Sequence, residues 1–246
     1  MLRLLRKNGA LLLRRIDEFL FPPLCLICDS PRPAGDRWLC TGCREKLTGQ
    51  IATRNSCPRC GQNRDFRICA CDVAWDFPFS RIFSFVDYDD AVQAVMHQIK
   101  YKGKVKFAFY LGTLCREYYR QPQSAEPECM VLPIPLHWLR KQKRGYNQAE
   151  WFARGLFCNS SSHVIATDVL KRVRNTRTQT KLDRSQRRRN LTGAFRLTPR
   201  GTSRIAGKTV VLVDDVITTG ATTAAAATVL LEGGCAGVSV VSFARD

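Results

Sequence analysis

The chain has 246 residues, which is enough for one domain with a substantial hydrophobic core and a small accessory domain. Lysine and arginine outnumber aspartate and glutamate by 39 to 21, and the formal net charge of +18 predicts attraction to polyanions, either nucleic acid or phosphorylated metabolites. No run approaches the roughly 20 apolar residues that span a bilayer, so the composition argues against an integral membrane protein.

Residues 1–24 form a basic amphipathic segment, in which leucine, isoleucine and phenylalanine are interspersed with arginine and lysine. Gly9 is expected to break or bend its helix, and Pro22-Pro23 to end it. A secretory signal peptide needs a longer uninterrupted apolar core, whereas arginines recur within this one. We therefore expect a soluble, cytoplasmic protein whose N-terminal helix docks on its own domain; contact of the helix with a membrane surface is the alternative.

Residues 25–75 are predicted to form a small zinc-binding domain. Eight cysteines gather here, and six of them form C-x-x-C pairs. The turn within such a pair lets both thiolates bind one tetrahedral metal, so two pairs make a four-cysteine site. The predicted ligands, paired in chain order, are Cys25, Cys28, Cys40 and Cys43 for one zinc and Cys57, Cys60, Cys69 and Cys71 for the other.

Other arrangements of these cysteines remain open. The pairs could interleave, and thiolates alone could also hold an iron–sulfur cluster, although the knuckle spacing favours zinc. Cys69-Ala-Cys71 departs from the C-x-x-C spacing, which makes the second site the weaker prediction. Disulfides are disfavoured where no export signal is found. Because the segment has too few apolar residues for a core of its own, structural zinc is expected to supply its stability, on the order of 10 kcal/mol per site.

Residues 76–246 have the pattern of an α/β domain. Strand, helix, helix and strand are predicted in that order over 81–90, 91–103, 106–119 and 129–135. Lys100, Lys102 and Lys104 surround a glycine at the end of the first helix. They fit either a solvated helix end or the edge of a phosphate site.

Two basic segments follow. The first carries Arg140, Lys143 and Arg144 and is predicted as a loop before a helix that opens at Asn147, which makes it a second place to hold anions. The second, residues 171–204, is the most basic stretch of the chain. Its weak apolar periodicity predicts a loop or exposed hairpin that a polyanion would order, as suits a lid.

The stretch 209–222 brings a strand, two acids and a small-residue turn together. Its apolar residues show no alternation, which is typical of a central strand covered on both faces. Asp214 and Asp215 stand at its carboxyl end, the edge where open α/β sheets bind ligands. The residues that follow are small enough for the backbone to close on an anion, and they open a helix over 223–232 whose amides favour phosphate. These turn residues are Thr218, Thr219, Gly220, Ala221 and Thr222.

The sequence TVVLVDDVITTGAT resembles the phosphoribosyl pyrophosphate (PRPP) motif of type I phosphoribosyltransferases, in which four apolar residues precede two acids and a T-G-x-T loop. The resemblance implies that Asp214 and Asp215, the catalytic candidates, hold the ribose hydroxyls of Mg²⁺-bound PRPP. It also implies that Thr218 to Thr222 hold the 5′-phosphate.

Along nearly its whole length the chain resembles the ComF family. Four segments carry the resemblance: the cysteine-rich head after LFPPLC, PIPLHWLRKQKRGYNQAE, RTQTKLDRSQRRRNLTGAF and VVLVDDVITTGAT. The second and third are also similar to the pyrophosphate loop and flexible loop of amidophosphoribosyltransferases. Arg140, Lys143 and Arg144 would then meet the pyrophosphate, and residues 177–189 would form the lid. The family implies a parallel sheet flanked by helices, of the type I phosphoribosyltransferase kind, behind a small N-terminal double zinc ribbon.

For many members the family also implies a role in natural transformation, in which incoming single-stranded DNA is handled. PRPP, single-stranded DNA and competence or recombination proteins are therefore the expected partners. The alternative is an active phosphoribosyltransferase of nucleotide or amine metabolism with no part in DNA uptake. The sequence shows no recognisable pocket for the phosphoribosyl acceptor.

Overall fold

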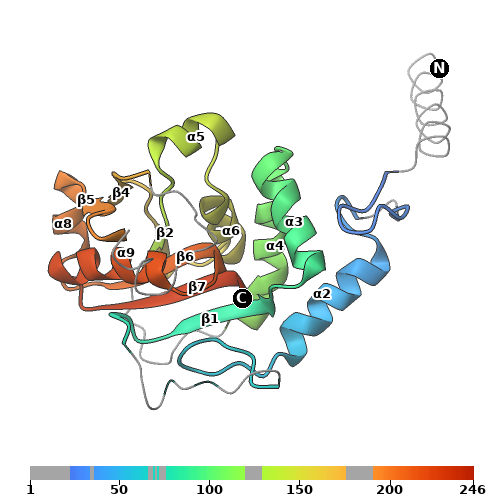
Figure 1. Ribbon diagram of the computed structural model, residues 1–246, viewed down its shortest axis with the longest axis horizontal. Helices are drawn as coiled ribbons and strands as arrows, with labels where there is room; N and C mark the ends of the chain where they lie inside the picture. Colours follow the sequence, from blue (N-terminus) through green and yellow to red (C-terminus); the bar gives the residue numbers. More distant parts are fainter. Residues whose placement is uncertain are drawn as a thin grey trace. The chain divides into compact units, whose positions relative to one another are not determined.

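The computed structural model describes residues 23–33, 36–65, 69, 71, 76–119, 129–175 and 191–246 (Figure 1). The chain divides into two compact units, Met1–Gly49 and Gln50–Asp246. Helix α2 (Thr41–Thr53) begins in the first unit and ends in the second. Nearly all of the predicted N-terminal helix, and the predicted lid at 177–189, lie outside the described residues.

A five-stranded sheet forms the centre of the larger unit, with strand order β1-β7-β6-β2-β3 and every pair parallel. The strands are β1 (Ile82–Asp87), β2 (Cys129–Pro133), β3 (His163–Ile165), β6 (Thr209–Ile217) and β7 (Gly237–Arg245). The middle strand, β6, is buried without a break from Val210 to Val213, as its unalternating sequence predicts for a strand covered on both faces. This is the predicted parallel α/β sheet.

Helices cover both faces of this sheet. The helices of this unit are α3 (Asp90–Tyr101), α4 (Val105–Cys115), α5 (Trp138–Arg144), α6 (Gln148–Leu156), α8 (Pro199–Ile205) and α9 (Ala221–Glu232), with a short 3₁₀ turn at Arg116–Tyr118. Helix α9 packs against Val210 and Leu212 of β6. On the α6 side, the ring of Phe152 lies 6.1 Å from that of Phe85 and 5.8 Å from that of Phe243. In the described part of the chain, no helix has both the length and the apolar character to cross a membrane.

Helices α4 and α6 cross at two glycines. A Cβ at Gly155 would lie 2.0 Å from the carbonyl oxygen of Phe109, and a Cβ at Gly112 would lie 2.3 Å from that of Phe152. The backbones of α4 and α6 therefore touch directly, and this close contact holds α6 against α4.

The first basic segment is a helix, and the prediction of a loop there is wrong. Helix α5 has a cap at each end: His137 Nδ1 accepts a hydrogen bond from the amide of Leu139 at 3.4 Å, and Gly145 closes the helix at φ +81°, its amide donating to Lys141 at 2.7 Å. A run of cations without apolar periodicity gives no helix signal, because α5 buries none of its residues.

The second basic segment is only partly a hairpin. Its ends pair as the antiparallel strands β4 (Leu170–Arg172) and β5 (Phe195–Leu197), and helix α8 follows. Residues 176–190 lie outside the described residues. Among the other predictions, β6 is longer than expected, since it continues through both acids to Ile217.

Candidate functional site

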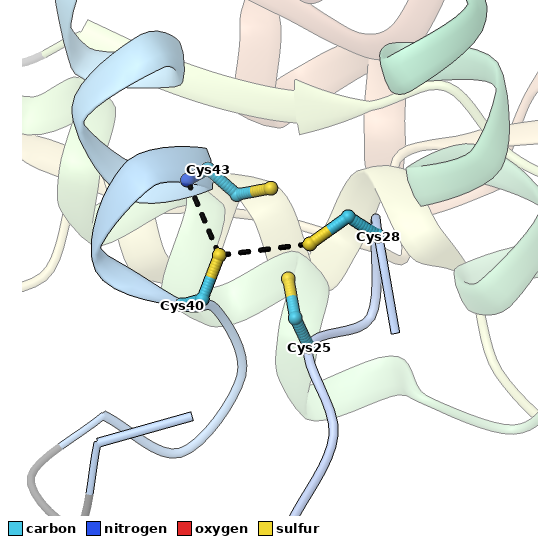
Figure 2. Close-up of side chains that lie close together, drawn as sticks. All are labelled: Cys25, Cys28, Cys40 and Cys43. Carbon is cyan, nitrogen blue, oxygen red and sulfur yellow. Dashed lines mark hydrogen bonds between the residues drawn. The ribbon is translucent and has the colours of Figure 1, made fainter. Parts of the chain in front are cut away.

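The smaller unit holds the first cysteine cluster. Figure 2 shows four sulfur atoms turned toward one shared space: those of Cys25 and Cys28 from one loop, that of Cys40 just before α2, and that of Cys43 in the first turn of α2. All four lie within 4.8 Å of one another, and those of Cys28 and Cys40 are 3.6 Å apart. Four sulfurs at about 2.3 Å from a tetrahedral zinc are spaced by roughly 3.8 Å, so the donor set fits zinc.

The second cluster lies in the larger unit and has the same geometry. The sulfur atoms of Cys57, Cys60, Cys69 and Cys71 also lie within 4.8 Å of one another, and those of Cys57 and Cys71 are 3.9 Å apart. The short Cys69–Cys71 spacing therefore does not keep its two thiols from the group. The cysteines are gathered in chain order, not interleaved.

The sheet edge at the carboxyl end of β6 holds the acidic pair. Asp215 is only 7% exposed, and its Oδ2 contacts Lys100 Nζ at 2.7 Å and accepts a hydrogen bond from Gln148 Nε2 at 3.3 Å. Asp214 Oδ1 accepts a hydrogen bond from the amide of Asp215 at 2.9 Å. Lys100 comes from the last turn of α3 and Gln148 is the first residue of α6. Three separate elements thus meet at the carboxylate of Asp215.

Lys100 makes the two acids unequal. Burial opposes ionisation of Asp215, but the ion pair with Lys100 outweighs it and lowers the pKa of Asp215 below its usual value. Burial in the site and the adjacent charge of Asp215 raise the pKa of Asp214. The edge therefore offers one firmly ionised carboxylate beside one that takes up a proton more readily.

The turn after β6 is the segment for which the sequence predicts an anion cradle. Gly220 adopts φ +76°, a left-handed conformation that favours glycine, directly before the first residue of α9. Thr219 Oγ1 accepts a hydrogen bond from the amide of Ala221 at 3.4 Å. Arg245, at the end of β7, donates to the carbonyl of Ile217 at 3.3 Å and also to that of Thr218. The start of a twelve-residue helix is thereby fixed at the sheet edge that carries the acids, where its amides and dipole favour an anion.

Helix α5 brings cations to the same edge, because β2 pairs with β6 and leads into it. The amide of Ile134, just after β2, donates to the carbonyl of Val213 at 2.8 Å. Arg144 donates to Gln148 Oε1, which extends a hydrogen-bonded chain through Gln148 to Asp215. Lys143 is exposed.

Arg172 of β4 adds a further charge to this edge. Burial and the charge of Arg140 lower the pKa of Arg172, while Asp214 acts in the opposite direction. These three charges, from β4, α5 and β6, therefore lie within electrostatic range of one another.

The residues that the sequence pattern did not assign to the site are Lys100, Gln148 and Arg172. The sequence allowed Lys100 to be either part of a solvated helix end or the edge of a phosphate site. Its ion pair with Asp215 places it at the edge of the candidate site. Nothing in the sequence pointed to Gln148 as a site residue except its position directly after Asn147, which caps the helix. Arg172 lay within a long run of cations, in which nothing distinguished it from its neighbours.

Comparison with known proteins agrees with this arrangement. Residues 130–246 match the family model of the phosphoribosyl transferase domain, and residues 16–72 match that of the double zinc ribbon domain. The chain is 30% identical over 233 residues to the DNA utilization protein YhgH of Escherichia coli O157:H7, which covers 91% of this chain and 97% of that protein.

Two further relatives are named for competence. Competence protein F of Haemophilus influenzae is 28% identical over 231 residues, covering 90% of this chain and 96% of the relative. Competence protein ComFC of Bacillus subtilis is 26% identical over 243 residues, covering 89% and 93%. The chain belongs to the ComF family.

In this ComF-family protein, the zinc ribbon match spans both cysteine clusters, so the family model and the sulfur geometry together support structural zinc. The phosphoribosyl transferase match spans the acidic pair, the turn and α5. Lys100 precedes residue 130 and lies outside that match. The cation that balances Asp215 thus comes from a helix that neither family model includes.

Proposed function

We propose that the protein binds PRPP with Mg²⁺ at the sheet edge formed by Asp214, Asp215 and the turn at 218–222, and that it handles incoming single-stranded DNA during natural transformation. The observation that carries the PRPP proposal is the buried Asp215 carboxylate, held ionised by Lys100 beside a helix start that opens on a left-handed glycine. Such an edge offers an acceptor for sugar hydroxyls next to a cradle for the attached phosphate.

Each group then has one task. Asp214 and Asp215 would accept hydrogen bonds from the ribose hydroxyls, and the turn would hold the 5′-phosphate. The cations of α5, Arg140, Lys143 and Arg144, receive the pyrophosphate. Bound Mg²⁺ supplies further positive charge for the phosphates. Departure of pyrophosphate builds cationic character on the sugar, so any reaction needs positioning and charge more than a strong base.

The DNA-handling part of the proposal is supported by the relatives and by charge. Two relatives are called competence proteins and one a DNA utilization protein. The net charge of +18 favours a polyanionic partner. Competence or recombination proteins are the expected protein partners.

A second candidate is an active phosphoribosyltransferase of nucleotide or amine metabolism, which the phosphoribosyl transferase match favours. Pyrophosphate release from PRPP in the presence of a panel of bases and amines separates the two. Turnover with one acceptor supports an enzyme, and no release with any of them supports a binding protein.

Calorimetric titration with Mg²⁺ and PRPP tests the site. We expect Asp214→Asn and Asp215→Asn each to weaken binding about tenfold or more, because each replaces a carboxylate oxygen that accepts a hydrogen bond with an amide group that donates one. The matched control is Asp168→Asn, which removes an exposed acid paired with Arg204 of α8; it should bind as the wild type does. Unchanged affinity in both site variants would place PRPP elsewhere.

A further inference from the structure

Two exposed aromatic rings stand at the two ends of a basic surface. Trp138, the first residue of α5, is 63% exposed, and Tyr101, the last residue of α3, is 70% exposed. The guanidinium of Arg144, at the far end of α5, lies 6.0 Å from the centre of the Tyr101 ring. The hydroxyl of Tyr146 also donates to the carbonyl of Ile99. The end of α5 therefore adjoins the end of α3, and Figure 1 shows both helices on the same side of the strands.

Most of the residues of α5 that follow Trp138 are cations, with Leu139 and Gln142 between them. Trp138, Lys141 and Arg144 follow one another at intervals of three along α5 and so form one ridge of the helix. A seven-residue helix is roughly 10 Å long. Along this ridge the ring of Trp138 is followed by the cations Lys141 and Arg144, and the ring of Tyr101 lies past the end of the helix. A single strand of a few nucleotides is long enough to follow these groups.

The two stretches that carry the ridge contain no acid of their own. Neither 91–116 nor 129–149 contains an aspartate or glutamate, whereas Lys102, Lys104 and Lys143 are exposed beside the ridge elements. The acids of the neighbouring sheet edge, Asp214 and Asp215, lie on β6, and Arg144 is linked to Asp215 through Gln148. Isolated exposed apolar side chains are ordinary in folded proteins. Exposed rings joined by cations are instead the composition of surfaces that bind single-stranded nucleic acid, in which bases stack on rings and phosphates meet the charges.

We propose that Trp138, Lys141, Arg144 and Tyr101 form a stacking platform for single-stranded DNA. The proposal rests on the proposed function in DNA handling and gives that function a place distinct from the basic stretch at 171–204. A duplex would not use the platform, because its base faces are covered by neighbouring pairs. PRPP has no base to stack. Arg144 belongs both to the platform and to the proposed pyrophosphate residues, so DNA and PRPP meet at α5.

Fluorescence anisotropy with two labelled probes of equal length tests the platform: oligothymidine, and an abasic strand with the same backbone. We expect Trp138→Leu and Tyr101→Leu each to weaken oligothymidine binding about tenfold at every salt concentration, since stacking is not ionic. Lys141→Gln should instead reduce the slope of log affinity against log salt by about 0.7, the value of one phosphate contact on a single strand. The matched control is Trp38→Leu, which removes a partly exposed tryptophan that also has an arginine, Arg37, 5.6 Å from its ring.

The abasic probe separates stacking from loss of fold. Wild-type protein should bind oligothymidine more tightly than the abasic strand, and both ring variants should lose that preference while still binding the abasic strand as the wild type does. The platform is overturned if wild-type protein binds the two probes equally or binds neither, or if both ring variants retain the preference. Trp138→Leu should bind Mg²⁺–PRPP as the wild type does. The DNA titrations therefore test the platform, and the PRPP titrations test the proposed PRPP site independently.

Discussion

The ammonium of Lys100 lies 2.7 Å from Asp215 Oδ2, with side-chain exposures of 25% and 10%. The substitution Lys100→Met removes this cation and leaves two adjacent, buried acids without it. We expect the free energy of unfolding to fall by about 2 kcal/mol at neutral pH, less than for a fully buried pair because Lys100 keeps some contact with water. Lys100→Arg, which retains the charge, is the matched control and should lose less.

The loss in Lys100→Met should depend on pH with a definite sign. Lys100 keeps the folded-state pKa of Asp215 below its usual value, so its stabilisation is present above the unfolded-state pKa and is lost as the pH falls through the folded-state pKa. Without Lys100 the pKa of Asp215 rises, and protonation removes the uncompensated charge. The free energies of unfolding of wild type and variant, from denaturant titrations, should therefore converge as the pH is lowered from neutral toward about pH 4, the usual pKa of an aspartate. A difference that grows on acidification would contradict this account.

The sequence identified the two acids of the site but not the residues that contact them. Asp214 and Asp215 could be singled out because a local motif surrounds them. The contacts of Asp215 with Lys100 and Gln148 join residues far apart in the chain. No local pattern encodes such contacts, because they exist only once α3 and α6 have packed around the sheet.

Among the elements, the crossing of α4 and α6 depends on Gly112 and Gly155. In Gly155→Ala the new Cβ would lie 2.0 Å from a backbone carbonyl, which cannot move aside as a flexible side chain can. We expect a loss of about 3 kcal/mol or more in the free energy of unfolding, because the helices must separate. Gly49→Ala in α2 is the matched control: nothing lies within 4 Å of its Cβ, and alanine should be neutral or stabilising there. Equal denaturation midpoints for wild type and Gly155→Ala would show that the crossing adjusts freely.

Elements with apolar periodicity were predictable and α5 was not. The four buried residues of α3, Val92, Val95, Met96 and Ile99, are those that the sequence spacing places on one face. Helix α5 buries none of its residues and is defined by a histidine cap and a glycine. Helical glycines such as Gly155 likewise give no sign in the sequence that another backbone will touch them.

For the whole molecule, the two cysteine clusters have different surroundings. The second belongs to the larger unit, where the amide of Ile82 in β1 donates to the carbonyl of Arg59 at 2.7 Å. Asp87, at the end of β1, receives hydrogen bonds at 2.7 Å from both Arg54 and Asn63. The first cluster belongs to the smaller unit. The predicted division at 1–24, 25–75 and 76–246 stays a prediction, since the compact units separate inside α2 and the zinc ribbon match ends at residue 72.

Zinc loss from the two clusters should therefore have different effects on the sheet. We expect Cys25→Ser with Cys28→Ser, and Cys57→Ser with Cys60→Ser, each to lower the zinc content of the purified protein by about one equivalent. Only the second pair should reduce hydrogen-exchange protection of the β1 amides, because the loop that accepts the Ile82 hydrogen bond is the one that the second zinc would hold. The first pair is the control for loss of zinc as such. Equal effects on β1 from both pairs, or intact protection in Cys57→Ser with Cys60→Ser, would mean that the hydrogen bonds of Arg54, Asn63 and Arg59 hold this loop on the sheet without metal.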